Sequence, residues 1–76
     1  MDKIFIEVIA VFTKEGNKIP LQIKWQNGQK YTIDRVMDIT KAASLKVGGR
    51  GIRYRCRIRG KDINLFLEDD KWFVEV

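Results

Sequence analysis

The sequence predicts an all-β fold: a small antiparallel barrel of five or six strands that comprises residues 1–76 as a single domain. Three observations lead to this fold class. Apolar residues alternate with polar ones in several short runs, tight-turn signals separate these runs, and the last third of the chain pairs with itself in a consistent register. An SH3-like topology is favoured over the OB-like alternative, because the segment between the third and fourth strands is too short for the usual OB-fold helix.

The size and composition of the chain limit what it can be. A chain of 76 residues has room for one hydrophobic core, and 45% apolar with 33% charged residues is typical of globular proteins. Cys56 is the only cysteine and there is no histidine, so an intramolecular disulfide is excluded and a zinc site would lack its usual ligands. We therefore expect a cytoplasmic protein without a metal or another cofactor.

The first expected strand is the apolar run at residues 4–12. Glu7 interrupts this run, no small-residue cleavage site follows it, and it is far too short to span a bilayer. We therefore expect neither a signal peptide nor contact with a membrane. Since both faces of the run are apolar, it predicts a strand that is buried on both faces. Residues 13–18 then form a turn in which Gly16 and Asn17 can adopt positive φ.

The next two strands form a hairpin around Asn27-Gly28, a strong turn signal. A three-residue loop with Gly28 in the left-handed conformation sets Ile23 opposite Tyr31, whereas a two-residue loop would turn Tyr31 away from the core. Pro20 is tolerated near the start of a strand or on a sheet edge. The residues expected to share the core face of the second strand are Ile19, Leu21, Ile23 and Trp25.

The middle of the chain contains two interruptions. The apolar alternation breaks at Asp34-Arg35, which predicts a bulge or bend. Residues 40–46 begin with an N-cap candidate, Thr40, and favour one helical turn at most. The glycine-rich residues 48–51 then precede the next strand.

The last third predicts a three-stranded meander, because one register matches apolar residues with apolar residues throughout. A second turn at Asp69-Asp70 pairs Leu67 with Trp72 and Phe66 with Phe73. With a two-residue turn at Gly60-Lys61, the facing pairs are Arg59 with Asp62, Ile58 with Ile63, Arg57 with Asn64, Cys56 with Leu65, Arg55 with Phe66, Tyr54 with Leu67, and Arg53 with Glu68.

A row of arginines is the main candidate for a functional site. The net charge of +5 is concentrated in residues 48–61, which carry six basic and no acidic residues. Alternate residues of a strand lie roughly 6.6–6.8 Å apart on one face. Basic side chains that share a face with aromatic rings suit single-stranded nucleic acid, because the charges contact phosphates and the rings stack on bases. The candidate nucleic-acid-binding residues are Lys46, Arg50, Arg53, Arg55, Arg57, Arg59, Phe66 and Phe73.

An ordinary solvated strand face is the alternative explanation of the arginine row. Asp62, Glu68 and Glu75 lie within cross-strand reach of three arginines, and charged rows also discourage aggregation of a β-rich chain. Phe66 and Phe73 can instead be buried within the chain or in a dimer. Two hypotheses follow: a module that binds nucleic acid or an acidic protein surface, and a protein-interaction or self-association module that is a monomer or weak homodimer.

The chain offers little for catalysis. It has no histidine and a single serine, Ser44, so a nucleophilic triad is absent, and the adjacent carboxylates Asp69-Asp70 fall in a predicted turn. We therefore expect no enzyme and no catalytic residues. The other distinctive side chains are expected to pack in the core: Trp25, Tyr31, Tyr54, Cys56 and Trp72.

Three segments, "WQNGQKYTIDRVMDI", "AASLKVGGRGIRYRCRIRG" and "LFLEDDKWFVEV", are similar to a family of short uncharacterised bacterial proteins. A tryptophan, an Asn/Asp-Gly turn and the motifs "Y-x-I-D-R-V", "A-A-S-L-K-x-G-G-x-G-I-R-Y" and "W-F-V-E" recur there in this order. The resemblance extends over about two thirds of the chain. It implies a compact β-barrel with no assigned activity. It also implies that the segment carrying Lys46, Arg50 and Arg53 serves the common role of the family.

Overall fold

The computed structural model describes residues 2–42 and 51–75, and these residues form a single antiparallel sheet. The prediction of an all-β fold is confirmed. The described residues form seven strands, one or two more than expected, because the chain breaks at Ile33-Asp34 into two separate strands. The strands are β1 (Lys3–Phe12), β2 (Lys18–Lys24), β3 (Lys30–Thr32), β4 (Arg35–Ala42), β5 (Gly51–Ile58), β6 (Lys61–Glu68) and β7 (Lys71–Glu75).

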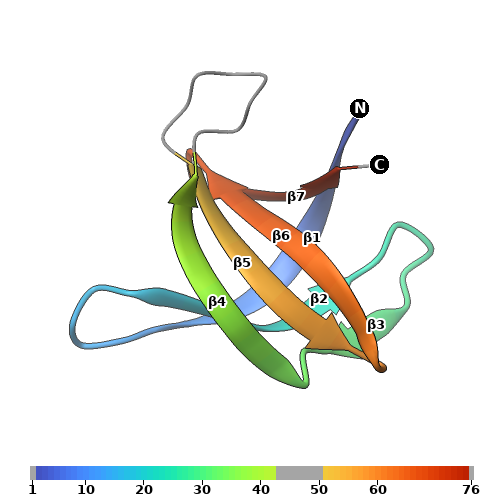
Figure 1. Cartoon of the computed structure of the whole chain (residues 1–76). Helices are drawn as coiled ribbons and strands as arrows, with labels where there is room; N and C mark the ends of the chain where they lie inside the picture. The colour runs from blue at the N-terminus through green and yellow to red at the C-terminus, as the bar shows by residue number, and fades with distance from the viewer. Residues whose placement is uncertain (1, 43–50, 76) are drawn as a thin grey trace.

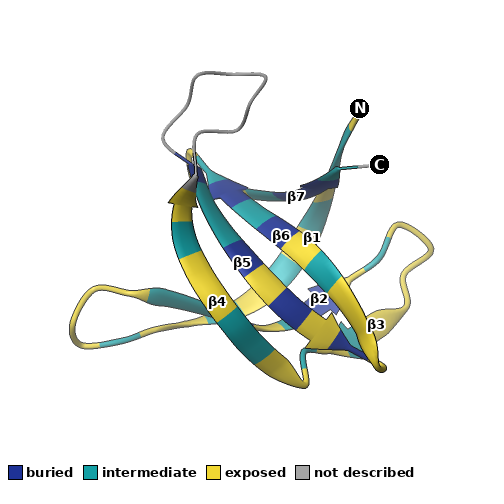
Figure 2. Cartoon of the chain, in the orientation of Figure 1, coloured by how far each residue is buried: buried dark blue, intermediate teal, exposed yellow. Residues whose placement is uncertain are grey.

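The sheet is strongly curled into a half-barrel (Figure 1). The strand order is β3-β2-β1-β7-β6-β5-β4, so β3 and β4 form the two edges. The hydrophobic core lies on the concave side, and strand β5 shows the expected alternation between buried and exposed residues (Figure 2). Because the sheet forms one curled layer, the described residues provide only limited cover for its convex side.

Strand β1 differs from the prediction that both of its faces are buried. Ile4, Ile6 and Val8 pack against the core, whereas Phe5 and Ile9 point to the convex side and are exposed. The Phe5 side chain is 56% exposed. The apolar run therefore forms one core face and one outer face, because a single-layer sheet covers each strand on one side only.

The predicted alternation of strand β2 is wrong because the strand contains a bulge. Ile9 pairs with Gln22 but Ala10 pairs with Pro20, which leaves Leu21 as the extra residue, and Leu21 is exposed. Beyond this bulge Ile19 pairs with Val11, which is on the outer face of β1. Ile19 therefore does not lie on the core face with Ile23, as the sequence had predicted. Proline has no N–H for a ladder hydrogen bond and is favoured at bulges and edges, as observed for Pro20.

The hairpin between β2 and β3 has the expected odd-length loop. Ile23 pairs with Tyr31, and Gly28 adopts a φ of 84°. The backbone N–H of Trp25 donates to the carbonyl oxygen of Gln29 at 2.8 Å, which closes the loop. The expected bend near Asp34 is also confirmed. The backbone N–H of Asp34 donates to the Arg57 carbonyl oxygen at 2.9 Å.

The turn between β5 and β6 lies one residue earlier than predicted. Its central residues are Arg59 and Gly60, with φ values of 52° and 78°, and Ile58 pairs with Lys61. A two-residue hairpin of type I′ requires positive φ at both central residues and favours glycine at the second one, which explains this position. Each pairing is shifted by two residues, so Cys56 faces Ile63 and not Leu65, but the side chains within strands β5 and β6 keep their predicted faces.

The turn between β6 and β7 is confirmed at Asp69-Asp70, where both residues have positive φ. Leu67 pairs with Trp72 and Phe66 with Phe73, as predicted. Asp70 also forms an ion pair with Lys18 of β2.

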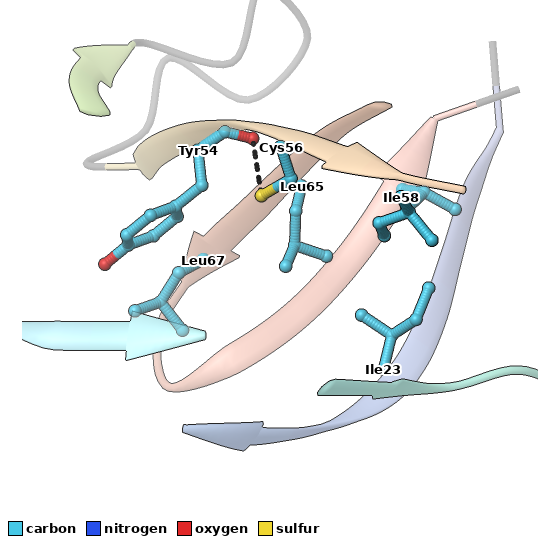
Figure 3. Packing of buried hydrophobic residues seen from close by; sticks show 7 residues of the cluster. Ile23, Tyr54, Cys56, Ile58, Leu65 and Leu67 are labelled. Atoms are coloured by element: carbon cyan, nitrogen blue, oxygen red, sulfur yellow. Dashed lines mark hydrogen bonds between the residues drawn. The ribbon is translucent and has the colours of Figure 1, made fainter. Parts of the chain in front are cut away.

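The core is built around strand β5 and its neighbour β6 (Figure 3). The hydroxyl group of Tyr54 donates to the backbone carbonyl oxygen of Lys18 at 2.6 Å and so ties β5 to β2 across the concave side. The Tyr54 ring also contacts Trp72, with 5.2 Å between the ring centroids. Cys56 is a buried free thiol, as expected for a small core residue. The buried residues of the cluster are Ile23, Tyr54, Cys56, Ile58, Leu65, Leu67 and Val74.

The helical turn predicted at residues 40–46 lies partly outside the described residues. Thr40 belongs to strand β4, which extends to Ala42, so the prediction that Thr40 caps a helix is wrong. Residues 43–50 are not described. Within the part of the chain that is described, there is no helix that is long and apolar enough to cross a membrane.

Replacing Arg59 with asparagine is expected to raise the free energy of unfolding by about 0.5–1 kcal/mol. Arginine is disfavoured in the left-handed region, whereas Asn-Gly is a preferred type I′ pair. The backbone N–H of Arg59, which donates to Asp34 Oδ2 at 2.9 Å, is retained in the variant. Urea unfolding of both proteins measures the difference, and a less stable variant would show that the Arg59 side chain stabilises the fold more than its backbone conformation costs.

Candidate nucleic-acid interface

The arginines of strand β5 lie on the convex side of the sheet. Arg55 and Arg57 are exposed, while the intervening residues Tyr54, Cys56 and Ile58 point into the core. The predicted face of the arginine row is therefore confirmed for the described strand. Arg53 continues the row and is partly buried.

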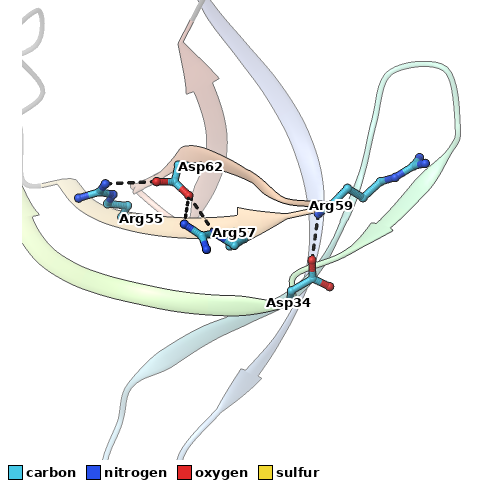
Figure 4. Close-up of polar contacts among 5 residues, drawn as sticks. All are labelled: Asp34, Arg55, Arg57, Arg59 and Asp62. Carbon is cyan, nitrogen blue, oxygen red and sulfur yellow. Dashed lines mark hydrogen bonds and ion pairs between the residues drawn. The ribbon is translucent and has the colours of Figure 1, made fainter.

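The carboxylate of Asp62 forms ion pairs with two of these arginines, Arg55 and Arg57 (Figure 4). Arg57 donates to Asp62 Oδ1 from Nε at 3.1 Å and from Nη2 at 3.0 Å, and Arg55 Nη2 donates to Asp62 Oδ2 at 3.2 Å. The hydrogen bonds from Arg57, followed by those from Arg55, lower the pKa of Asp62. One negative charge therefore lies between two guanidinium groups, whose side chains remain about half exposed. The expected pairing of Asp62 with Arg59 is wrong, since the shifted turn sets Asp62 opposite Arg57.

Arg59 does not belong to the row. It lies in the turn after β5, and its guanidinium group is 5.9 Å from the centroid of the Tyr31 ring. The prediction that Arg59 continues the arginine row is therefore corrected, because the strand ends at Ile58.

The Phe73 ring is buried, with only 1% of its surface exposed, although it lies on the convex side. It stacks on Phe66 with 5.2 Å between centroids and 11° between planes, and it contacts Phe5 at 5.6 Å. Lys3 Nζ lies 4.6 Å from the centroid of the Phe73 ring and 3.5 Å from Glu68 Oε1. Phe73 is thus enclosed and offers no face to a base, whereas Phe66 is partly exposed. Glu68, which was expected to face Arg53, pairs with Lys3 instead.

Two further residues lie on the convex surface, and the sequence analysis did not identify either of them as a candidate site residue. Arg35 of β4 lies opposite Arg57, and Phe5 of β1 lies opposite Phe73. The pairing of β4 with β5 depends on a register shift between Val36 and Asp38, which the sequence does not specify. Phe5 lies in a run that is apolar on both faces, so nothing in the sequence marks it as an exposed ring.

The structure therefore brings together part of the predicted site and adds to it. Lys46 and Arg50 lie outside the described residues. One row across the sheet contains Arg53, Phe66, Phe73 and Phe5 in neighbouring strands. Hereafter the arginine face denotes the accessible residues of this surface, Arg35, Arg53, Arg55, Arg57, Phe66 and Phe5.

The arginine face is positively charged on balance. Its four arginines are accompanied on the same side of β4 and β6 by three carboxylates, Asp38, Asp62 and Glu68, of which Glu68 pairs with Lys3. Asp38 lies opposite Arg55 and accepts a hydrogen bond from the Thr40 hydroxyl group at 2.9 Å. An excess of guanidinium groups beside accessible phenyl rings can bind a polyanion that carries flat apolar groups.

No group of three or more metal-ligating side chains occurs within residues 2–42 and 51–75. At the arginine face the guanidinium groups supply positive charge and the phenyl rings supply surfaces for stacking. A comparison of the chain with family models, curated proteins and solved structures finds no match in any of the three, so the family resemblance stays a prediction and the geometry alone supports a function.

Proposed function

We propose that this protein is a non-enzymatic binding module that binds single-stranded nucleic acid through the arginine face. The observation that carries the proposal is the position of Arg53, Arg55 and Arg57 on the outer side of one strand. Guanidinium groups at alternate positions form a line that an extended phosphate backbone can follow.

The electrostatics of Asp62 support this proposal. Its carboxylate orients Arg55 and Arg57 in neighbouring positions but neutralises only one of the two charges. Arginine donates from a rigid planar group that can contact a phosphate with two parallel hydrogen bonds. Two pre-positioned guanidinium groups therefore lose less conformational entropy on binding than two mobile side chains.

The aromatic residues give the second part of the interface. Phe66 is supported from behind by the buried Phe73 ring, so its accessible part is held rigidly beside Arg53. Phe5 is exposed at the other end of the same row. Stacking of a base on such a ring contributes about 1–3 kcal/mol by alanine substitution and is tolerant of sequence. We therefore propose weak base preference and strong dependence on salt.

Two substitutions with opposite expected effects test this proposal. Arg55→Ala is expected to weaken binding of labelled single-stranded RNA and DNA about three- to tenfold and to reduce the slope of log K against log salt by about 0.7. Asp62→Asn is expected to strengthen binding about threefold, because it removes the negative charge between the two guanidinium groups while its amide oxygen can still accept a hydrogen bond from an arginine. Fluorescence anisotropy at two salt concentrations measures both effects.

The matched control is Asp70→Asn. It changes the net charge by the same amount, but Asp70 lies at the other end of β6 and pairs with Lys18. It is expected to change the affinity less than Asp62→Asn does. Equal effects of the two substitutions would show that only net charge matters, and an absence of binding near micromolar concentrations would exclude this function.

A protein-interaction or self-association module is the second candidate, and one observation favours it. Ile9 and Val11 are exposed neighbours on the convex side of β1, with Phe5 exposed beyond Glu7 on the same face, and exposed apolar surface is typical of contact sites. Sedimentation of the free protein separates the candidates, since a dimer that dissociates on Ile9→Ser and binds no oligonucleotide supports this alternative.

The remaining expectations belong to the same proposal. A cytoplasmic location is in keeping with the single cysteine of the chain, because disulfide-rich sequences are typical of oxidising compartments. An SH3-like classification is supported by the short antiparallel strands that curl around one small core. An acidic protein surface is the other partner that the arginine face would suit.

A further inference from the structure

A cleft lies where strand β6 separates from strand β7. Strands β6 and β7 pair only at Phe66, Leu67 and Glu68, and beyond these residues the two strands diverge (Figure 1). The opening leads to a cleft of about 880 Å³ that is lined by β6, β7, the turn after β5 and the β2–β3 hairpin. Its volume is in the range of small-molecule sites in proteins.

The floor of the cleft is apolar and belongs to the core. Ile23, Ile58 and Val74 line it, and each of these side chains is buried. Trp25 and Tyr31 from the β2–β3 hairpin add two partly buried aromatic rings. A ligand that enters this cleft would therefore need an apolar and preferably flat body, because a polar body would lose its hydration without finding hydrogen-bond partners on the floor.

Two cations line the same cleft: Arg59 in the turn after β5 and Lys61 at the start of β6. Arg59 and Lys61 are exposed, and neither forms an ion pair with a described residue. The nearby carboxylate of Asp62 is engaged by Arg55 and Arg57. Glu75 of β7 also lines the cleft. The turn side of the cleft is therefore complementary to a negative charge.

We propose that this cleft binds a small amphipathic organic anion. Its flat apolar body lies against Ile23, Ile58 and Val74 beside the Trp25 ring, and its carboxylate or sulfonate group contacts Arg59 and Lys61. The apolar contact supplies most of the affinity, and the two cations select an anion over a neutral molecule of the same shape. The cleft adjoins the arginine face at Phe66 and at Asp62, the carboxylate that pairs with Arg55 and Arg57. The contacts proposed for the cleft do not depend on the function proposed for that face.

Two dyes of matched shape test the proposal: 8-anilinonaphthalene-1-sulfonate, which is an anion, and N-phenyl-1-naphthylamine, which lacks the sulfonate group. The anion is expected to bind about five- to tenfold more tightly. The double substitution Arg59→Asn and Lys61→Gln is expected to remove most of this preference while leaving binding of the neutral dye unchanged. Asparagine preserves the turn, because it accepts the positive φ of position 59.

Two control variants separate the cleft from the remaining surface. Lys71→Gln makes the same charge change as Lys61→Gln at a residue that does not line the cleft. Ile9→Ser removes an exposed apolar side chain of the outer face of β1, which is another place where such dyes can bind. Neither substitution is expected to change the affinity for the anionic dye. In an NMR titration, the indole N–H signal of Trp25 is expected to shift, whereas that of the core residue Trp72 stays in place.

Four results would overturn the proposed binding of an anion in the cleft. Equal affinity for both dyes, no loss of preference in the double variant, or loss of binding on Ile9→Ser would each overturn the proposal. Absence of dye binding at millimolar concentration would overturn it as well. Retained amide dispersion in each variant shows that the fold is intact, so a lost preference reports on the site itself.

Discussion

Replacing Phe73 with alanine is expected to lower the free energy of unfolding by about 3–5 kcal/mol. The ring is 1% exposed, stacks on Phe66 and contacts Phe5, so its removal leaves a cavity on the convex side of the sheet. Globular domains have roughly 0.05–0.15 kcal/mol of stability per residue, so a domain of this size would lose a large fraction of its stability. Urea unfolding followed by circular dichroism measures the change.

The matched control is Phe5→Ala in the same row of the sheet. Its side chain is 56% exposed, so we expect a loss of about 1 kcal/mol, well below that for Phe73. If both variants lost only about 1 kcal/mol, the result would contradict the enclosed position of Phe73 and would make both rings surface residues. The comparison also bears on the arginine face, because Phe66 can present a rigid ring there only if Phe73 supports it.

The sequence predicted the local turn chemistry and the faces of the last three strands. Gly28 takes the left-handed conformation, the Asp69-Asp70 turn lies where expected, and Arg55 points outward while Cys56 points inward. These features depend on residues close together in the chain, and a register error of two residues leaves each side chain on its face. The turn was predicted at Gly60-Lys61 and lies at Arg59-Gly60, but this error did not change which residues were expected in the core.

The exposure of individual convex residues was not predictable in the same way. Period-2 alternation assigns residues to two faces of a strand but does not say what covers each face. Phe73 is enclosed because Lys3 and Glu68, which are 65 residues apart, pair beside its ring. Phe5 is exposed although its run is apolar throughout. The cleft depends on the divergence of β6 from β7, for which the sequence carries no signal.

Raising the pH from 9 to 11 is expected to lower the free energy of unfolding by about 2 kcal/mol through Cys56 alone. Burial raises the pKa of the Cys56 thiol to about 11 from 9.0. Between these values the unfolded chain has released the thiol proton while the folded protein still holds it, so the unfolded state binds fewer protons and stability falls as pH rises. Each pKa unit corresponds to about 1.4 kcal/mol. Well below pH 9 the thiol is protonated in both states and contributes no pH dependence.

The variant Cys56→Ala isolates this contribution, because it has no thiol to titrate. Burial, followed by the nearby Cys56 charge, also raises the pKa of Tyr54 from 10.0, so part of the alkaline loss of stability is expected to remain in the variant. Urea unfolding at several pH values between 8 and 11 gives the slope for each protein. The parent should lose stability more steeply than the variant from pH 9 upward. Parallel slopes would mean that Cys56 ionises as readily in the folded protein as in the unfolded chain, which its buried position between Tyr54 and Ile58 on the core face of β5 argues against.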